Sequence, residues 1–235
     1  DPNFPDLYFQ SNVIYGPNGD TVLRYRRMIS LYTPSPYDVW DRYLDTYGAD
    51  AVFPVAATEI GVLGSIASEE VLYPEIARVQ AFKGAEIFCH PTSEVGAPTL
   101  PPKHIAKKAR AIENIAYVVS ANSAQIIGTP VPAASTDGMS IELDWYGRTL
   151  AEANQGETLN ANAVLDIGAL RETRRKTGMT NTLSRLPNAA FVVAYEHANH
   201  APANRTPDAQ MIERKDAIAQ QQAVIDRLVA SGVLK

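Results

Sequence analysis

Short apolar runs alternate with segments of helical apolar spacing along much of the chain. Apolar runs bounded by turn residues are typical of β-strands, and they occur at residues 9–15, 21–25, 51–55, 59–66, 85–89 and 116–121. Apolar positions three or four residues apart predict helices, and they occur at residues 35–47, 74–82 and 103–114. Because strands and helices alternate between residues 50 and 121, we expect an α/β layered sandwich.

The helix predicted at residues 103–114 has an amphipathic pattern. We expect its apolar face to point into the core with Ile105, Ala109 and Ile112. The opposite face, which we expect to be solvated, carries Lys103, Lys107, Lys108 and Arg110.

Strands dominate the region after residue 121. A pair is predicted at residues 139–143 and 150–153, joined by a turn at 144–147, and a last strand at 162–167 precedes a short helix to residue 176. Residues 201–207 are rich in proline, alanine and asparagine and predict a linker, and helical spacing resumes at 208–234. We therefore divide the chain into a sandwich domain, residues 1–198, and a linker with a C-terminal helix, residues 199–235.

The composition is that of a soluble globular protein, with 46% hydrophobic and 20% charged residues. A formal net charge of −5 argues against nucleic acid or an anionic membrane as the main partner. Cys89 is the only cysteine, so no intrachain disulfide forms, and no apolar stretch is long enough for a membrane span. With no signal-peptide pattern at the start, we expect a cytoplasmic protein.

Four short motifs follow one another in the chain. They are PNGD at 17–20 with YRR at 25–27, SEEVLYPE at 68–75, GAEI at 84–87 with HPTS at 90–93, and RAIEN at 110–114 with VVSAN at 118–122. In this order they resemble the nitrilase superfamily of carbon–nitrogen hydrolases, over about residues 8–185. The resemblance implies a four-layer α-β-β-α sandwich that pairs with a second copy, and hydrolysis of non-peptide amides or nitriles by a Cys–Glu–Lys triad without metal or cofactor.

Three departures from the family pattern concern the triad itself. Ser68 stands at the cysteine position, and its hydroxyl is far less acidic than a thiol and needs a base. Arg27 stands at the lysine position and is larger, forked and harder to deprotonate. The 26 residues before Arg27 offer no candidate for the first glutamate, so we expect the family's N-terminal segment to be missing from this chain.

The resemblance assigns catalytic positions to Ser68 and Arg27. It also places potential substrate contacts at Glu70, His90, Thr92 and Ser93. Each has a structural alternative: Ser68 as a small residue filling the turn, Arg27 in a salt bridge with a nearby glutamate, Glu70 holding the turn, and residues 90–93 as a capped turn.

Two functions remain open on these residues. One is a hydrolase of small-molecule amides or nitriles in which Ser68 attacks, Arg27 holds the oxyanion, and a glutamate comes from outside this chain. The other is an inactive binding or assembly subunit that keeps the fold and forms homo-oligomers. A third interpretation, an engineered Cys-to-Ser change at position 68, does not account for Arg27.

Overall fold

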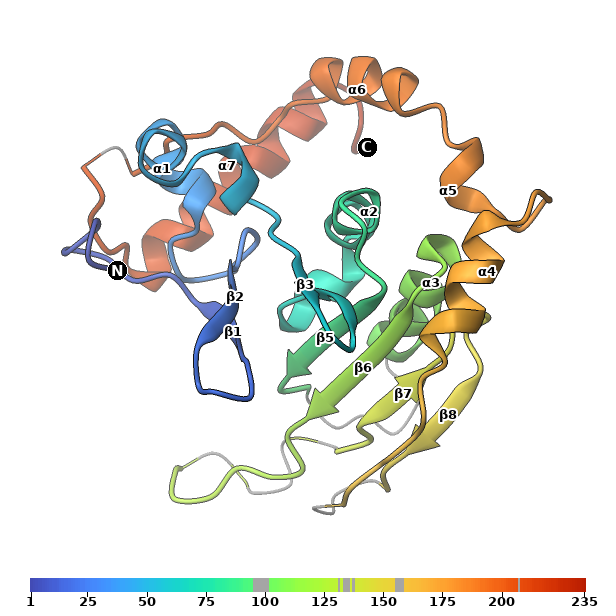
Figure 1. The fold of residues 1–235 in the computed structure, drawn as a ribbon. Coiled ribbons are helices and arrows are strands. Elements are labelled where there is room, and N and C mark those ends of the chain that lie inside the picture. The colour runs from blue at the N-terminus through green and yellow to red at the C-terminus, as the bar shows by residue number, and fades with distance from the viewer. Residues whose placement is uncertain (95–101, 131, 133–135, 137, 155–158, 207) are drawn as a thin grey trace. The chain divides into compact units, whose positions relative to one another are not determined.

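The computed structural model describes residues 1–94, 102–130, 132, 136, 138–154, 159–206 and 208–235 (Figure 1). The chain forms two compact units. Unit 1 comprises Asp1–Ser11, Tyr25–Val52 and Pro187–Lys235, and unit 2 comprises Asn12–Arg24 and Phe53–Leu186. Strands β1 (Ser11–Tyr15) and β2 (Thr21–Arg26) form a separate two-stranded sheet, which confirms the predicted hairpin.

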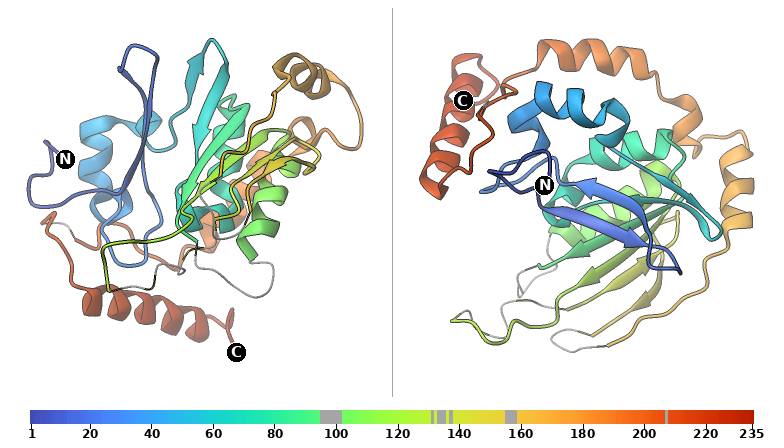
Figure 2. Two further views of the ribbon diagram at one scale, coloured as in Figure 1. Left: turned by 90° about the horizontal axis from the view of Figure 1, so that it is seen from below. Right: turned by 60° about the vertical axis from the view of Figure 1, so that its left-hand side comes forward.

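Unit 2 is built on a six-stranded sheet whose spatial order follows the chain. Its strands are β3 (Ala56–Thr58), β4 (Gly61–Ser65), β5 (Ile87–Thr92), β6 (Tyr117–Asn122), β7 (Ile141–Leu143) and β8 (Thr149–Glu152). The central strands β4, β5 and β6 are parallel, and the other neighbours pair antiparallel (Figures 1 and 2). The central parallel strands therefore direct their carboxyl ends to the same edge.

Helices α2 (Pro74–Phe82) and α3 (Pro102–Asn114) are the connections that make parallel strands possible. The side chain of Gln80 on α2 reaches β4, where it accepts from the backbone nitrogen and donates to the carbonyl of Ser65, both at 2.7 Å. Gly64 leaves the space for this contact, because a Cβ there would lie 2.4 Å from Gln80 Oε1 and 3.2 Å from the Phe88 ring.

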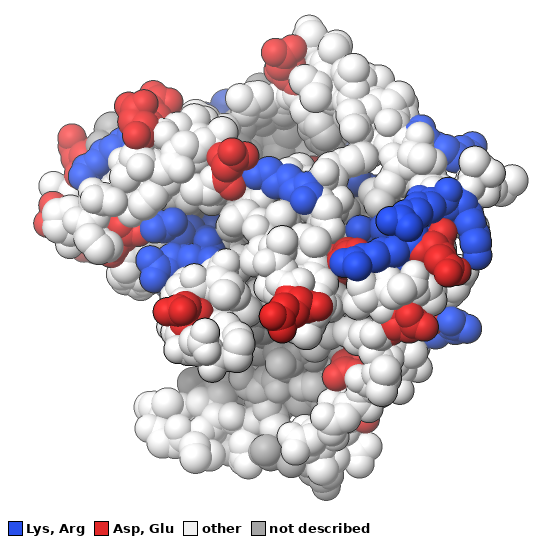
Figure 3. Space-filling view, viewed as in Figure 1, with Lys and Arg blue, Asp and Glu red and all other residues white. Residues whose placement is uncertain are grey.

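The opposite face of the sheet carries a core of buried apolar side chains: Leu63, Ile87, Ile115, Tyr117 and Leu170. Leu170 comes from α4 (Ile167–Arg175), which precedes the short α5 (Thr182–Arg185). Two arginines fasten α4: Arg171 pairs with Glu86 at 2.6 Å, and Arg174 donates to the carbonyl of Ile115 at 2.8 Å. Basic side chains gather over α4 in Figure 3, and the sequence of this helix contains Arg171, Arg174 and Arg175.

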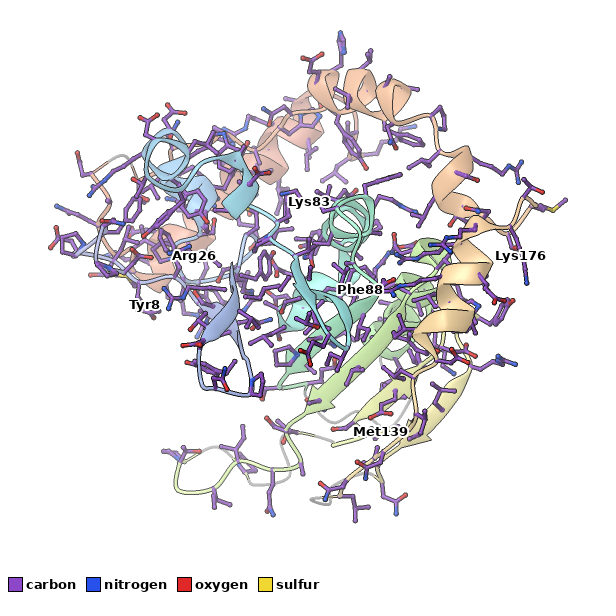
Figure 4. The ribbon with its side chains drawn as sticks, viewed as in Figure 1. Tyr8, Arg26, Lys83, Phe88, Met139 and Lys176 are labelled. Atoms are coloured by element: carbon purple, nitrogen blue, oxygen red, sulfur yellow. The ribbon has the colours of Figure 1, made fainter. Side chains whose placement is uncertain are left out.

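The described residues of unit 1 form the α-helices α1 (Trp40–Tyr47), α6 (Asn188–His197) and α7 (Arg214–Ala230). The predicted linker packs against the turn before α1. Arg205 pairs with Asp38 at 2.7 Å, and Thr206 N donates to the Asp38 carbonyl at 3.0 Å. The guanidinium of Arg26 lies 3.9 Å from the centre of the Tyr47 ring, within an aromatic cluster (Figure 4).

The α/β fold is confirmed, but two predicted strands are wrong. Residues 49–51 form a short 3-10 helix and pairing starts only at Ala56, because Pro54 interrupts the apolar run and has no N–H to donate. No strand forms at 162–167. There the N–H and carbonyl of Asp166 both bond to the Tyr117 hydroxyl instead of to a neighbouring strand.

The predicted orientation of α3 is also wrong. Ile105 is 62% and Ile112 49% exposed, whereas Lys107 and Arg110 are buried. The buried charges have partners: Lys107 pairs with Glu94, and the Nε of Arg110 donates to the Val71 carbonyl at 2.8 Å. In the described ranges, no helix is both long and apolar enough to cross a lipid bilayer.

Replacing Gly64 with alanine tests the contact between β4 and α2. We expect Gly64→Ala to lower the free energy of unfolding by about 1–3 kcal/mol, because the new methyl group overlaps Gln80 and displaces its two hydrogen bonds. Urea unfolding measures the change. The control is the same substitution made in a Gln80→Ala background. There Gly64→Ala should lower the free energy of unfolding clearly less than in the unchanged protein. An equal decrease in both backgrounds would contradict this packing.

Candidate active site

Ser68 lies at a strand-to-helix turn at the carboxyl edge of the parallel strands. Strand β4 ends at Ser65, a 3-10 helix runs over Ser68–Leu72, and α2 starts at Pro74. Open α/β sheets form their ligand sites at this edge. The turn therefore places a partly exposed serine where a site is expected.

The backbone of Ser68 is in the left-handed region, with φ of 49°. A residue with a Cβ pays about 1–2 kcal/mol for this conformation, since the Cβ crowds the following carbonyl oxygen. Such strain persists only where neighbouring groups hold it, and it gathers at functional turns. The left-handed conformation of Ser68 therefore needs contacts from the surrounding structure.

Three side chains hold the turn around Ser68. The Nε2 of His90 lies 2.8 Å from the Ser68 carbonyl oxygen, and the Thr92 hydroxyl donates to Ser68 Oγ at 3.4 Å. Glu70 is fully buried, and its carboxylate accepts the backbone N–H of Ala67 at 3.1 Å. His90 and Thr92 lie two positions apart on β5, so both side chains project from the same face of the sheet toward Ser68.

His90 is buried and its two ring nitrogens are both engaged. Its Nδ1 lies 2.9 Å from the hydroxyl of Ser120, which is its register partner on β6. The pKa of His90 is lowered to about 4, mainly by burial; the positive charge of Lys107 also lowers this pKa, while the Ser68 carbonyl and Glu94 act in the opposite direction. The ring is therefore neutral at pH 7.

A buried ion pair lies beside His90. Lys107 on α3 and Glu94, just after β5, approach within 3.2 Å, and their side chains are 0% and 2% exposed. The backbone nitrogen of Glu94 donates to the Asn122 side chain at 2.7 Å, which ties the pair to the end of β6. Sequence reasoning missed this pair because it placed Lys107 on the solvated face, and a partner 13 residues away leaves no periodic pattern.

The structure thus brings together Ser68, Glu70, His90 and Thr92. Ser93 is exposed just beyond β5. Arg27 belongs to unit 1, where its guanidinium donates to the Ile29 carbonyl at 2.7 Å and to the Gln10 side chain at 2.8 Å.

Cys89, the one thiol of the chain, lies on β5. Burial raises the pKa of the Cys89 thiol to about 11, so thiolate is scarce at neutral pH. No group of three or more His, Cys, Asp or Glu side chains among the residues that the structure describes could hold a metal ion.

The family model for carbon–nitrogen hydrolases matches residues 3–175. The chain belongs to this family. It is 26% identical over 185 residues to the deaminated glutathione amidase of Yersinia enterocolitica, and 25% identical over 176 residues to the omega-amidase NIT3 of Saccharomyces cerevisiae. These alignments cover 78% and 74% of this chain but 60% and 59% of the relatives, so the chain spans about three fifths of their length.

Solved structures of the same family share the fold. A carbon–nitrogen hydrolase from Helicobacter pylori G27 superimposes with a TM-score of 0.61 at 22% identity, over 80% of this chain and 65% of that one. Nit3 of Saccharomyces cerevisiae, a nitrilase-superfamily member, gives 0.58 at 22% identity, over 77% and 61%. The family resemblance and the α/β fold are both confirmed, and the roles of Ser68 and Arg27 stay predictions.

The lowered pKa of His90 predicts a pH dependence of stability. Between its ordinary value of 6.5 and about 4, the unfolded chain binds more protons at this group than the folded chain. Lowering the pH through this window should therefore reduce the free energy of unfolding, by on the order of 3 kcal/mol from His90. Urea unfolding at a series of pH values measures the slope of the free energy of unfolding against pH.

We expect His90→Gln to make this slope smaller, and His197→Gln, at an exposed histidine, to leave the slope unchanged. Equal slopes in the two variants and the unsubstituted protein would contradict a buried neutral His90.

Proposed function

We propose that this protein hydrolyses the carbon–nitrogen bond of small-molecule amides or nitriles, with Ser68 as the nucleophile. The observation that carries the proposal is the strained, held backbone of Ser68 at the carboxyl edge of the parallel strands. Family membership supports the reaction class, and the relatives named above are amidases. The substrate class that follows is a linear amide without a peptide backbone.

In the proposed reaction with an amide, Ser68 Oγ attacks the carbonyl carbon and gives up its proton to a base. The resulting tetrahedral oxyanion is stabilised by the Arg27 guanidinium, which offers charge and several N–H donors. The C–N bond then breaks as the departing nitrogen takes the proton back from the base, which releases ammonia and leaves an acyl ester on Ser68. Water then hydrolyses the ester to a carboxylic acid and restores the hydroxyl. In the family's triad a glutamate takes the role of this base.

The polar residues around Ser68 divide between direct and indirect roles in this proposal. Thr92 donates to the attacking oxygen and orients it, and the exposed Ser93 offers a hydroxyl to the substrate. Glu70 and His90 act indirectly, because the carboxylate of Glu70 bonds the Ala67 N–H and the His90 ring bonds Ser68 and Ser120.

A second function, a non-catalytic binding or assembly subunit, is favoured by one feature of the site. Among the residues that the structure describes, the hydroxyl of Thr92 is the hydrogen-bond partner of the Ser68 hydroxyl. A hydroxyl is not a base, so Thr92 does not activate Ser68 for attack. This alternative expects no ammonia from any amide or nitrile. Both functions are compatible with homo-oligomers, so the oligomeric state measured by light scattering does not distinguish them. A measurement of turnover does.

Ammonia release from a panel of simple amides and nitriles tests the nucleophile. We expect Ser68→Ala to lower kcat by about 10³-fold or more, because the acyl intermediate no longer forms. We expect Ser68→Cys to turn over, since it restores the family's nucleophile at the same position. Ser231→Ala, in the C-terminal region, is the matched control. Undiminished turnover in Ser68→Ala would remove the proposal, and no turnover in any of the four proteins would favour the non-catalytic subunit.

Substitution of Arg27 tests its role as oxyanion donor. We expect Arg27→Met to lower kcat by about 10²–10³-fold, the usual loss for one such donor. Arg27→Lys should retain most of the activity, because lysine is the family residue and keeps the charge. Steady-state kinetics with the best amide of the panel measure both. An unchanged kcat in Arg27→Met would show that Arg27 has a structural role, such as its contacts with Ile29 and Gln10, and does not stabilise the oxyanion.

A further inference from the structure

His90 touches the nucleophile position through the backbone rather than through the hydroxyl. Its Nε2 lies 2.8 Å from the carbonyl oxygen of Ser68, the residue with positive φ. A carbonyl oxygen can only accept, so Nε2 must carry the proton. The bond therefore restrains the peptide that follows Ser68, where a strained conformation needs an outside partner.

The second ring nitrogen completes the arrangement. With the proton on Nε2 of a neutral ring, Nδ1 is an acceptor, so the Ser120 hydroxyl donates to it at 2.9 Å. Protonation of Nδ1 would force Ser120 to reverse its hydroxyl. The tautomer is thus fixed by two neighbours, one on the turn and one on β6.

The charged groups around the ring favour this neutral form. Lys107 and Lys103 on α3 oppose a further positive charge, and Glu94 alone among the three neighbours favours it. Because Glu94 pairs with Lys107, its carboxylate is largely compensated. Buried, charge-balanced surroundings keep the ring uncharged while leaving its hydrogen bonds intact.

The geometry points to His90 as a positioning residue that clamps the Ser68 carbonyl and so sets the direction of the residue-68 side chain. This inference rests on the proposed function for its effect on turnover, but the clamp itself is a property of the folded chain. The Ser120–His90–Ser68 series (the clamp) links β6, β5 and the turn before α2.

Two substitutions that introduce an amide side chain distinguish the hydrogen bond of residue 90 to Ser68 from the effect of side-chain size. In His90→Gln the side-chain N–H₂ stands as many bonds from Cβ as Nε2 does, so it can still donate to Ser68. In His90→Asn the amide is one bond shorter and reaches only the Ser120 side. His197→Asn, at an exposed ring, is the matched control.

The experiment combines amide turnover with nitrogen-15 NMR of the histidine rings, in the chain as it exists. We expect His90→Asn to lower kcat tenfold to about 10²-fold with KM changed less than about twofold, since small misplacements cost rates of this size. His90→Gln should recover most of the loss. Equal losses in His90→Asn and His90→Gln, or no loss in either, would overturn the clamp as a positioning device.

The NMR measurement does not depend on turnover. We expect His90 to show the Nε2–H tautomer and to stay neutral at pH 6. A proton on Nδ1, or an imidazolium at pH 6, would overturn the clamp whatever the protein catalyses. The Nε2–H tautomer in a protein that releases no ammonia would support the clamp and overturn the proposed function, so the two failures are distinguishable.

Discussion

The left-handed backbone of Ser68 is the constraint on which the rest of the site depends. A serine gains nothing locally from this conformation, so the strain must be balanced by contacts that the surrounding structure supplies. They come from both sides of the turn: Glu70 bonds the N–H of the preceding residue, and His90 bonds the Ser68 carbonyl. The parallel order of β4, β5 and β6 is what brings the second contact to the carboxyl edge.

Buried charge shapes the helices that flank this edge. Lys107 with Glu94, and Arg110 with the Val71 carbonyl, turn the charged face of α3 inward and leave Ile105 and Ile112 exposed. Removing one member of such a pair usually costs more than the pair contributes, because the remaining charge stays buried. The pair beside His90 therefore fixes α3 in place and sets the electrostatic surroundings of the ring.

The elements with regular local patterns were predictable from the sequence, whereas the contacts between distant segments were not. Local apolar spacing found the hairpin, α2 and the central strands, because their patterns have short periods. Apolar spacing gave the wrong orientation for α3. A hydropathy pattern treats lysine as solvated, because it contains no information on an ion-pair partner from another segment of the chain. The motif order found Ser68, His90 and Thr92, which lie on β5 or the turn after β4. Ser120 and Glu94 became visible only through strand register and side-chain packing.

If Ser68 is the nucleophile, as we propose, it forms a covalent acyl intermediate, and brief reaction with an activated ester such as p-nitrophenyl acetate detects this intermediate. Acid quenching followed by peptide mass spectrometry locates the acetyl group. We expect one acetyl group per chain, on the peptide that contains Ser68, and its loss in Ser68→Ala. Acetylation confined to lysines, tyrosines or the N-terminus, and equal in both proteins, would contradict it and leave a family member that keeps the fold for binding or assembly.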